Sequence, residues 1–136
     1  MITVICGKKG SGKTKRILDL ANDMVLSSNG KIIFVDYDNR CMYDLRHQVR
    51  YMIAPEYGID NPDRFYGFLS GLVAGDFDTD AIFIDAFLKI VKEDIVKLEG
   101  FFKLLKTLAD KNNVKFFISL SCEREIIPES IQAYIA

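Results

Sequence analysis

Histidine and cysteine, the side chains that most often hold transition metals, are scarce in this chain of 136 residues. The one histidine, His47, lies in a polar stretch, where a solvated position is expected rather than a metal ligand. Cys6, Cys41 and Cys122 are odd in number and lack the spacing of metal ligands. We therefore expect no zinc site, and three free thiols, largely buried, in a protein from a reducing compartment.

Long apolar stretches and runs of one charge sign are also missing. The formal net charge is -1 and no cluster of lysines or arginines stands out, which argues against general attraction to nucleic acid or anionic lipid. No stretch approaches the roughly 18 apolar residues that span a bilayer. A glycine loop follows within a few residues of Met1, so no secretory leader is expected. These absences predict a cytoplasmic protein without membrane association.

The composition is that of a folded globule, with 49% hydrophobic and 27% charged residues. A chain of 136 residues suffices for one compact domain, expected over residues 1–136. Short apolar runs alternate with segments of helical periodicity from end to end, which predicts an α/β fold with a mostly parallel five-stranded sheet and helices on both faces. Strands are expected at 2–6, 31–36, 49–53, 81–85 and 114–120, and helices from 13 to about 28, at 39–48, at 62–75, at 91–111 with a kink at Gly100, and from Pro128 onward.

The segment between the first strand and the first helix fits the pattern G-x-x-x-x-G-K-[ST] in full. Its glycines allow backbone N–H groups to point at phosphate oxygens, and the following helix N-terminus adds a favourable dipole. Lys13 is expected to reach the β- and γ-phosphates of ATP, and the Thr14 hydroxyl to bind Mg²⁺. The residues expected to contact the nucleotide are Gly7, Lys8, Lys9, Gly10, Ser11, Gly12, Lys13 and Thr14.

Three aspartates end two of the predicted strands. Asp85 closes the apolar strand 81–84, the place of the acid that holds magnesium, although a cap of the next helix is the alternative. Hydrolysis also needs a carboxylate near the γ-phosphate, and Asp85 is followed by Ala86 rather than by a glutamate. Asp38 is therefore our first choice of base and Asp36 the second; alternatively, both cap a helix that begins near residue 39.

Further polar residues are candidates for contact with the terminal phosphate. Ser119 and Ser121 end the fifth strand, where a side chain either senses the γ-phosphate or is simply solvated. Arg40, Arg64 and Arg124 are candidates for a transition-state cation, within the chain or toward a neighbouring subunit, or are ordinary surface arginines.

Taken together, these residues resemble the ATPase core of the RecA and KaiC class of P-loop NTPases. The strand that ends in Asp36, Tyr37 and Asp38 has the layout of the family's strand that carries the catalytic glutamate, which implies that Asp38 is a shortened base. The resemblance also implies a sheet order of 5-1-4-3-2 with the phosphate-loop strand inside. DNA-binding loops, the assembly segment and the extra C-terminal strands of recombinases are missing, so recombination is not implied.

A second family shares some of these features. ParA and MinD proteins resemble the chain in Lys8 and in the Asp36-x-Asp38 pattern, but they are longer and have glycine where this loop has Lys9. The expected function is a magnesium-dependent ATPase or ATP-dependent switch that acts on an unidentified protein partner or by self-association. The alternatives are a degenerate binding or assembly module without turnover, a ParA/MinD-like ATPase, and a small-molecule kinase, for which no arginine-rich lid is visible.

Overall fold

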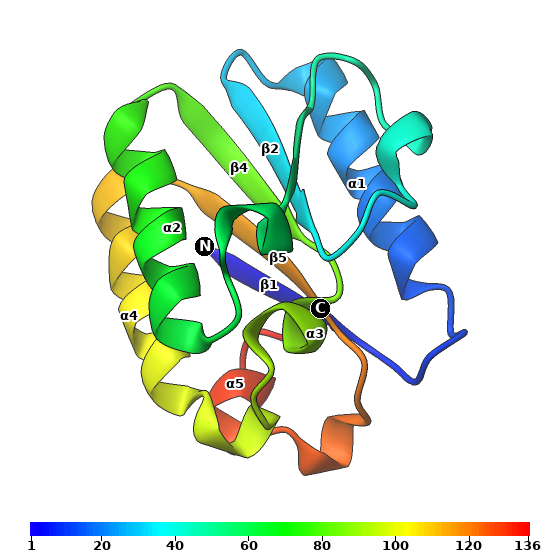
Figure 1. Cartoon of the computed structure of the whole chain (residues 1–136), viewed down its shortest axis with the longest axis vertical. Helices are drawn as coiled ribbons and strands as arrows, with labels where there is room; N and C mark the ends of the chain where they lie inside the picture. Colours follow the sequence, from blue (N-terminus) through cyan, green and yellow to red (C-terminus); the bar gives the residue numbers. More distant parts are fainter.

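Five parallel strands form one sheet with helices on both faces in the computed structural model, which describes residues 1–136 (Figure 1). The predicted α/β class is therefore confirmed. The strands are β1 Ile2–Cys6, β2 Lys31–Asp36, β3 Arg50–Ile53, β4 Thr79–Ile84 and β5 Lys115–Leu120. The α-helices are α1 Lys13–Ser27, α2 Pro62–Gly75, α3 Phe87–Val91, α4 Glu99–Asn112 and α5 Glu129–Gln132, and short 3₁₀ turns occupy Met42–Asp44, Ala54–Tyr57, Ile95–Lys97 and Arg124–Ile126.

The strand order is β1-β5-β4-β2-β3, so the expected order 5-1-4-3-2 is wrong. The fifth strand, and not the first, pairs with β4, and β1 pairs with β5 alone among the strands. Burial explains this arrangement. Nearly every residue of β2, β4 and β5 is buried, whereas β1 and β3 include several half-buried or exposed residues, as strands at the two margins of a sheet do.

The outer edge of β1 is not left open. The Val4 N–H donates to the Tyr134 carbonyl at 2.8 Å, and the Ala136 N–H donates to the Val4 carbonyl at 3.0 Å. Residues 134–136, which we call the C-terminal strap, thus run along β1 and satisfy backbone groups that an edge strand would expose. The phosphate-loop strand is consequently the outermost strand, yet it has hydrogen-bonded neighbours on both sides.

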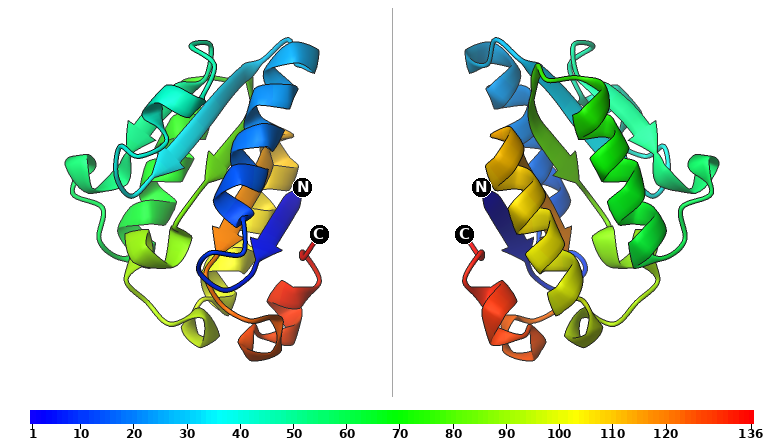
Figure 2. Two further views of the ribbon diagram at one scale, coloured as in Figure 1. Left: turned by 90° about the vertical axis from the view of Figure 1, so that its right-hand side faces the viewer. Right: turned by 90° about the vertical axis from the view of Figure 1, so that its left-hand side faces the viewer.

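Helices lie on both faces of the sheet (Figure 2), and each face has its own apolar core between the strands and the helices. Helix α1 covers one face, where Ile17 and Ala21 belong to the same core as Phe83 of β4 and Phe117 of β5. The two rings stack with centroids 4.5 Å apart. Helices α2, α3 and α4 cover the other face with a larger core rich in phenylalanine. Burial of each such side chain contributes about 1.5–3 kcal/mol, so the carboxyl ends of the strands are held firmly at one edge of the sheet.

The prediction of a helix at 39–48 is wrong, because that segment is a loop with a single 3₁₀ turn. Asn22 of α1 accounts for the difference. Its side-chain amide donates to the Asp44 carbonyl at 2.9 Å and accepts from the Arg46 N–H at 2.8 Å. A tertiary contact thus satisfies the backbone groups that a helix would otherwise have paired locally.

The helix expected at 91–111 begins later, at Glu99, and Gly100 lies in its first turn rather than at a kink. Lys92 adopts a left-handed conformation, with φ of 51°, and ends α3. The start expected for α2 is confirmed, because Asn61 accepts from the Arg64 N–H at 2.8 Å ahead of Pro62. None of the helices combines the length and the apolar character needed to cross a bilayer.

Candidate functional site

The loop between β1 and α1 has the backbone conformation that its glycines allow. Gly10 and Gly12 have φ values of 86° and 88°, in the left-handed region where other residues are strained. Gly7 gives room to Ser11, because a Cβ atom at this position would lie 2.4 Å from the Ser11 hydroxyl and would make that side chain move. No side chain caps α1 at Gly12, so the first amides of the helix are available to an anionic ligand.

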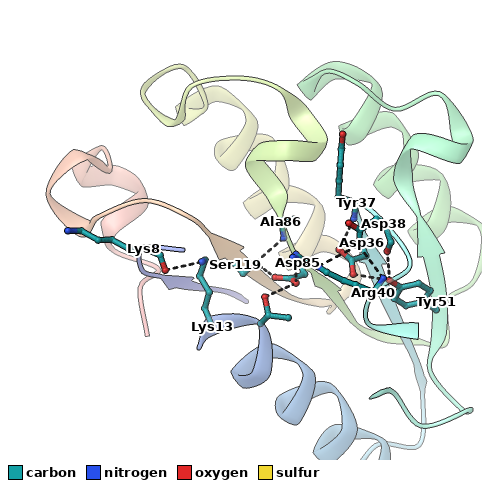
Figure 3. A network of polar contacts seen from close by, with 11 residues as sticks. Lys8, Lys13, Asp36, Tyr37, Asp38, Arg40, Tyr51, Asp85, Ala86 and Ser119 are labelled. Atoms are coloured by element: carbon teal, nitrogen blue, oxygen red, sulfur yellow. Dashed lines mark hydrogen bonds and ion pairs between the residues drawn. The ribbon is translucent and has the colours of Figure 1, made fainter. Parts of the chain in front are cut away.

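Lys13 is a buried lysine with no carboxylate partner. Only 9% of the residue is exposed, and its ammonium group donates a single hydrogen bond, to the Lys8 carbonyl at 3.3 Å (Figure 3). A buried cation without a counter-charge is unfavourable, and a bound anion offsets that cost. The ammonium group therefore has no counter-charge of its own in this structure.

Asp85 is almost completely buried and joins three elements at the carboxyl ends of the strands. Thr14, 71 residues away along the chain, donates its hydroxyl to Asp85 Oδ2 at 3.1 Å. Ser119, from β5, donates to Oδ1 and accepts the Ala86 N–H at 3.1 Å (Figure 3). The structure thus brings together the two predicted magnesium ligands, Thr14 and Asp85. No backbone amide binds the carboxylate of Asp85, so it is not a helix cap.

A cavity of about 320 Å³ opens between the glycine loop and this edge of the sheet. Three larger cavities, of about 480, 850 and 350 Å³, lie away from the glycine loop: at the start of β2 to β4, between α2 and α4, and beside the residues that precede β2, β4 and β5. The smaller cavity has four cationic side chains against one carboxylate, which suits a polyphosphate with its metal ion. Its lining residues are Lys9, Gly10, Lys13, Thr14, Arg40, Asp85, Ala86, Lys89 and Ser121.

Lys89 is the charged lining residue that was not predicted from the sequence. It lies on α3, four positions after Asp85, and has no ion pair. The signal available in the sequence was a lysine at the start of the helix that follows the acidic strand end. Such lysines are usually solvated, so spacing alone would not have singled it out.

Asp36, the second choice of base, is fully buried at the end of β2. Tyr51 donates its hydroxyl to Asp36 Oδ2 at 2.8 Å, and the Tyr37 N–H donates to Oδ1 at 2.7 Å. Burial raises the pKa of Asp36, and the hydrogen bonds from Tyr51 and Tyr37 only partly oppose this effect. A carboxyl already engaged by two donors is poorly placed to accept a proton from water.

Cys41 lies beside this carboxyl and completes a small polar cluster. The ligand-type atoms of Asp36, Cys41 and Asp85 all lie within 4.8 Å of one another. Burial and the neighbouring Asp36 raise the pKa of the Cys41 thiol to about 12, so the group is not a thiolate at neutral pH. Cys41 and Cys122 are buried free thiols, as predicted, while Cys6 is half-buried and also free.

Asp38, the first choice of base, is exposed and paired with an arginine. Its carboxylate accepts the Arg40 N–H at 3.2 Å and lies 3.5 Å from Arg40 Nε. No helix begins after it, so the capping alternative for Asp36 and Asp38 is wrong. Neither aspartate lines the cavity, whereas Arg40 does. The role of Asp38 as base stays a prediction.

Most of the remaining candidates lie outside the cavity. Lys8 turns away from Lys13 and pairs with Glu123 at 2.9 Å (Figure 3). Arg64 pairs with Asp60 at 3.1 Å, and Arg124 lies in a turn outside the cavity. Arg40 is thus the only one of the three candidate arginines that lines the cavity. Of the two serines, Ser121 lines it and Ser119 holds Asp85.

Comparison with solved structures shows that other proteins share the fold of this chain. Among 92 matching chains of solved structures is the flagellar accessory protein FlaH from Methanocaldococcus jannaschii, with a TM-score of 0.61 and 12% sequence identity. The match covers 97% of this chain but 65% of FlaH, so the chain spans less than two thirds of that protein. No protein-family model and no curated protein sequence matches the chain. At 12% identity the likeness shows the fold alone.

Proposed function

We propose that this chain binds a purine nucleoside triphosphate, ATP, together with Mg²⁺, and that the bound nucleotide controls its contact with a protein partner or with further copies of itself. One observation carries the proposal. The glycine loop places Thr14 within hydrogen-bond distance of Asp85, at a cavity that Lys13 also lines. The two side chains come from distant parts of the sequence and belong to the element types that hold magnesium in phosphate-loop proteins.

Each group in the cavity has a separate task in this proposal. The loop amides and the N-terminus of α1 hold the α- and β-phosphates, and Lys13 binds the β- and γ-phosphates. The Thr14 hydroxyl and the Asp85 carboxylate hold Mg²⁺, which neutralises phosphate charge when it is bound. Ser119 keeps Asp85 in place, because its hydroxyl is fixed between that carboxylate and the Ala86 N–H.

Slow turnover is the second part of the proposal. The chain has no glutamate after Asp85, Asp36 is engaged by two donors, and Asp38 is tied to Arg40. Asp38 is the base that remains available once its ion pair opens. These contacts favour a nucleotide-dependent switch over a fast hydrolase, and they keep a binding module without turnover as the alternative. A ParA/MinD-like mechanism is less favoured, because Lys8 pairs with Glu123 and does not line the cavity.

Calorimetric titration with ATP, with and without Mg²⁺, tests the proposal. Lys13→Ala should weaken ATP binding by about 100-fold or more, because it removes a charge-assisted contact to two phosphates. Lys15→Ala is the matched control, since Lys15 lies on the same helix turn and pairs with Asp19 on the exposed surface. Equal ATP affinity in the two variants would contradict the proposal. Titration with GTP in parallel tests the preference for adenine.

A further inference from the structure

Arg40 occupies a place in the cavity that a metal ion also requires. Its Nη2 atom lies 3.5 Å from Asp85 Oδ2, the same oxygen that accepts the Thr14 hydroxyl at 3.1 Å. It is the only cationic side chain within ion-pair distance of Asp85. Arg40 therefore serves as the counter-charge of a buried carboxylate that the proposed function assigns to Mg²⁺ (Figure 3).

A dication at Thr14 and Asp85 and a guanidinium at the same oxygen repel each other. The contact of Arg40 with Asp85 is long, and 46% of the Arg40 side chain is exposed, so this contact opens more readily than the one from Ser119. Magnesium bound with a nucleotide should accordingly displace the end of the Arg40 side chain and leave the Ser119 contact intact.

The displaced guanidinium cannot travel far. The backbone N–H of Arg40 and its Nε atom are both held by Asp38, at 3.2 and 3.5 Å. The guanidinium stays charged wherever it turns, because an arginine side chain does not lose its proton in proteins. With the nucleotide bound as in the proposed function, the anion next to the magnesium ligands would be the terminal phosphate.

We propose that Arg40 makes the site selective for triphosphates over diphosphates. Mg²⁺ with the nucleotide releases Arg40 from Asp85, and Arg40 then binds the γ-phosphate. A diphosphate causes the same release but supplies no terminal phosphate, so Arg40 loses one partner without gaining another. The site therefore prefers MgATP to MgADP through one side chain that pivots on Asp38. This inference rests on the proposed function and specifies the ligand that the site selects.

Calorimetry at saturating Mg²⁺ with MgATP and with MgADP measures the preference directly. In the natural chain we expect MgATP to bind about tenfold or more tightly than MgADP, the usual size of a charge-assisted contact to an exposed phosphate. Arg40→Ala should remove most of this preference, because it weakens MgATP binding and frees Asp85 for MgADP; the preference that remains comes from the contact of Lys13 with the γ-phosphate. Arg40→Gln, a neutral side chain that can still hydrogen-bond to Asp85, should do the same and replaces Arg40→Ala if that variant does not fold.

Two further variants separate Arg40 from other cations. Arg64→Ala is the matched control, since Arg64 is an exposed arginine in an ion pair with Asp60 outside the cavity, and it should leave the preference unchanged. Lys89→Ala tests the rival cation in the cavity. If Lys89→Ala abolishes the preference while Arg40→Ala and Arg40→Gln retain it, the inference is overturned.

Failure of the inference differs from failure of the proposed function. If the natural chain binds neither nucleotide, or if Lys13→Ala binds both as tightly as the natural chain does, both are wrong. If the natural chain binds MgATP in a Lys13-dependent manner but the Arg40 variants keep the natural MgATP to MgADP ratio, only the role of Arg40 is refuted.

Discussion

Replacing Lys13 by methionine should stabilise the fold while it removes the proposed phosphate contact. The ammonium group of Lys13 has one hydrogen bond of 3.3 Å and no acidic partner, and the residue is only 9% exposed. Methionine has a similar volume and fills the same space without a charge to desolvate. We expect the free energy of unfolding to rise by about 1–2 kcal/mol, because an incompletely solvated cation is replaced by an apolar group.

The assay is thermal unfolding followed by circular dichroism, without nucleotide. At about 2.1 cal/mol/K of unfolding entropy per residue, a gain of 1–2 kcal/mol raises Tm by roughly 4–7 °C for a chain of this size. Lys15→Met is the control, since Lys15 is exposed and its loss should leave Tm nearly unchanged. MgATP should reverse the ranking, because a ligand at 100 times its Kd adds about 2.7 kcal/mol to the natural chain alone.

A lower Tm for Lys13→Met than for Lys15→Met would refute this reasoning. It would mean that the bond from Lys13 to the Lys8 carbonyl organises the loop enough to outweigh the cost of the buried charge. Equal stabilisation of Lys13→Met and Lys15→Met by MgATP would refute the other part of the prediction, that Lys13 binds the phosphates.

Three more outcomes can be measured. Asp85→Asn should abolish the Mg²⁺ dependence of ATP binding in calorimetry, because an amide is a weak magnesium ligand; unaltered dependence on Mg²⁺ would count against Asp85. Asp38→Asn should still bind ATP but should no longer release phosphate. If phosphate release is lost in Asp36→Asn and not in Asp38→Asn, Asp36 is the base. The pKa of Asp36 is raised, so its contribution to stability declines as pH rises from the ordinary aspartate range through the raised value. Asp36→Asn should lack this part of the decline of Tm with rising pH. An identical dependence of Tm on pH in the natural chain and in Asp36→Asn would disprove the prediction.

The meeting of the glycine loop with Asp85 was predictable because both signals are local, whereas the positions of Asp36 and Asp38 outside the cavity were not. The spacing of glycines from Gly7 to Thr14 specifies the loop, and an apolar strand ending in Asp85 specifies its partner. Parallel strands bring both to one edge of the sheet, whatever the order of the strands. The positions of Arg40 and Lys89 in the cavity were harder to predict, since the position of a long surface side chain depends on the loop or short helix that carries it.

Strand order and loop structure depend on contacts between distant segments, which periodicity does not report. The central place of β5 follows from burial on both of its faces, a property it shares with β2 and β4. Helical spacing at 39–48 was overridden by Asn22, whose side chain binds two backbone groups of that segment. In both cases tertiary packing outweighed local preference.

The C-terminal strap limits how copies of this chain can associate. Residues 134–136 already occupy the backbone groups of Val4 on the outer side of β1. A second chain that adds a strand there must first detach the strap, whereas the outer edge of β3 has no strand beside it. Edge-to-edge growth of the sheet is therefore directed to the margin opposite the phosphate loop.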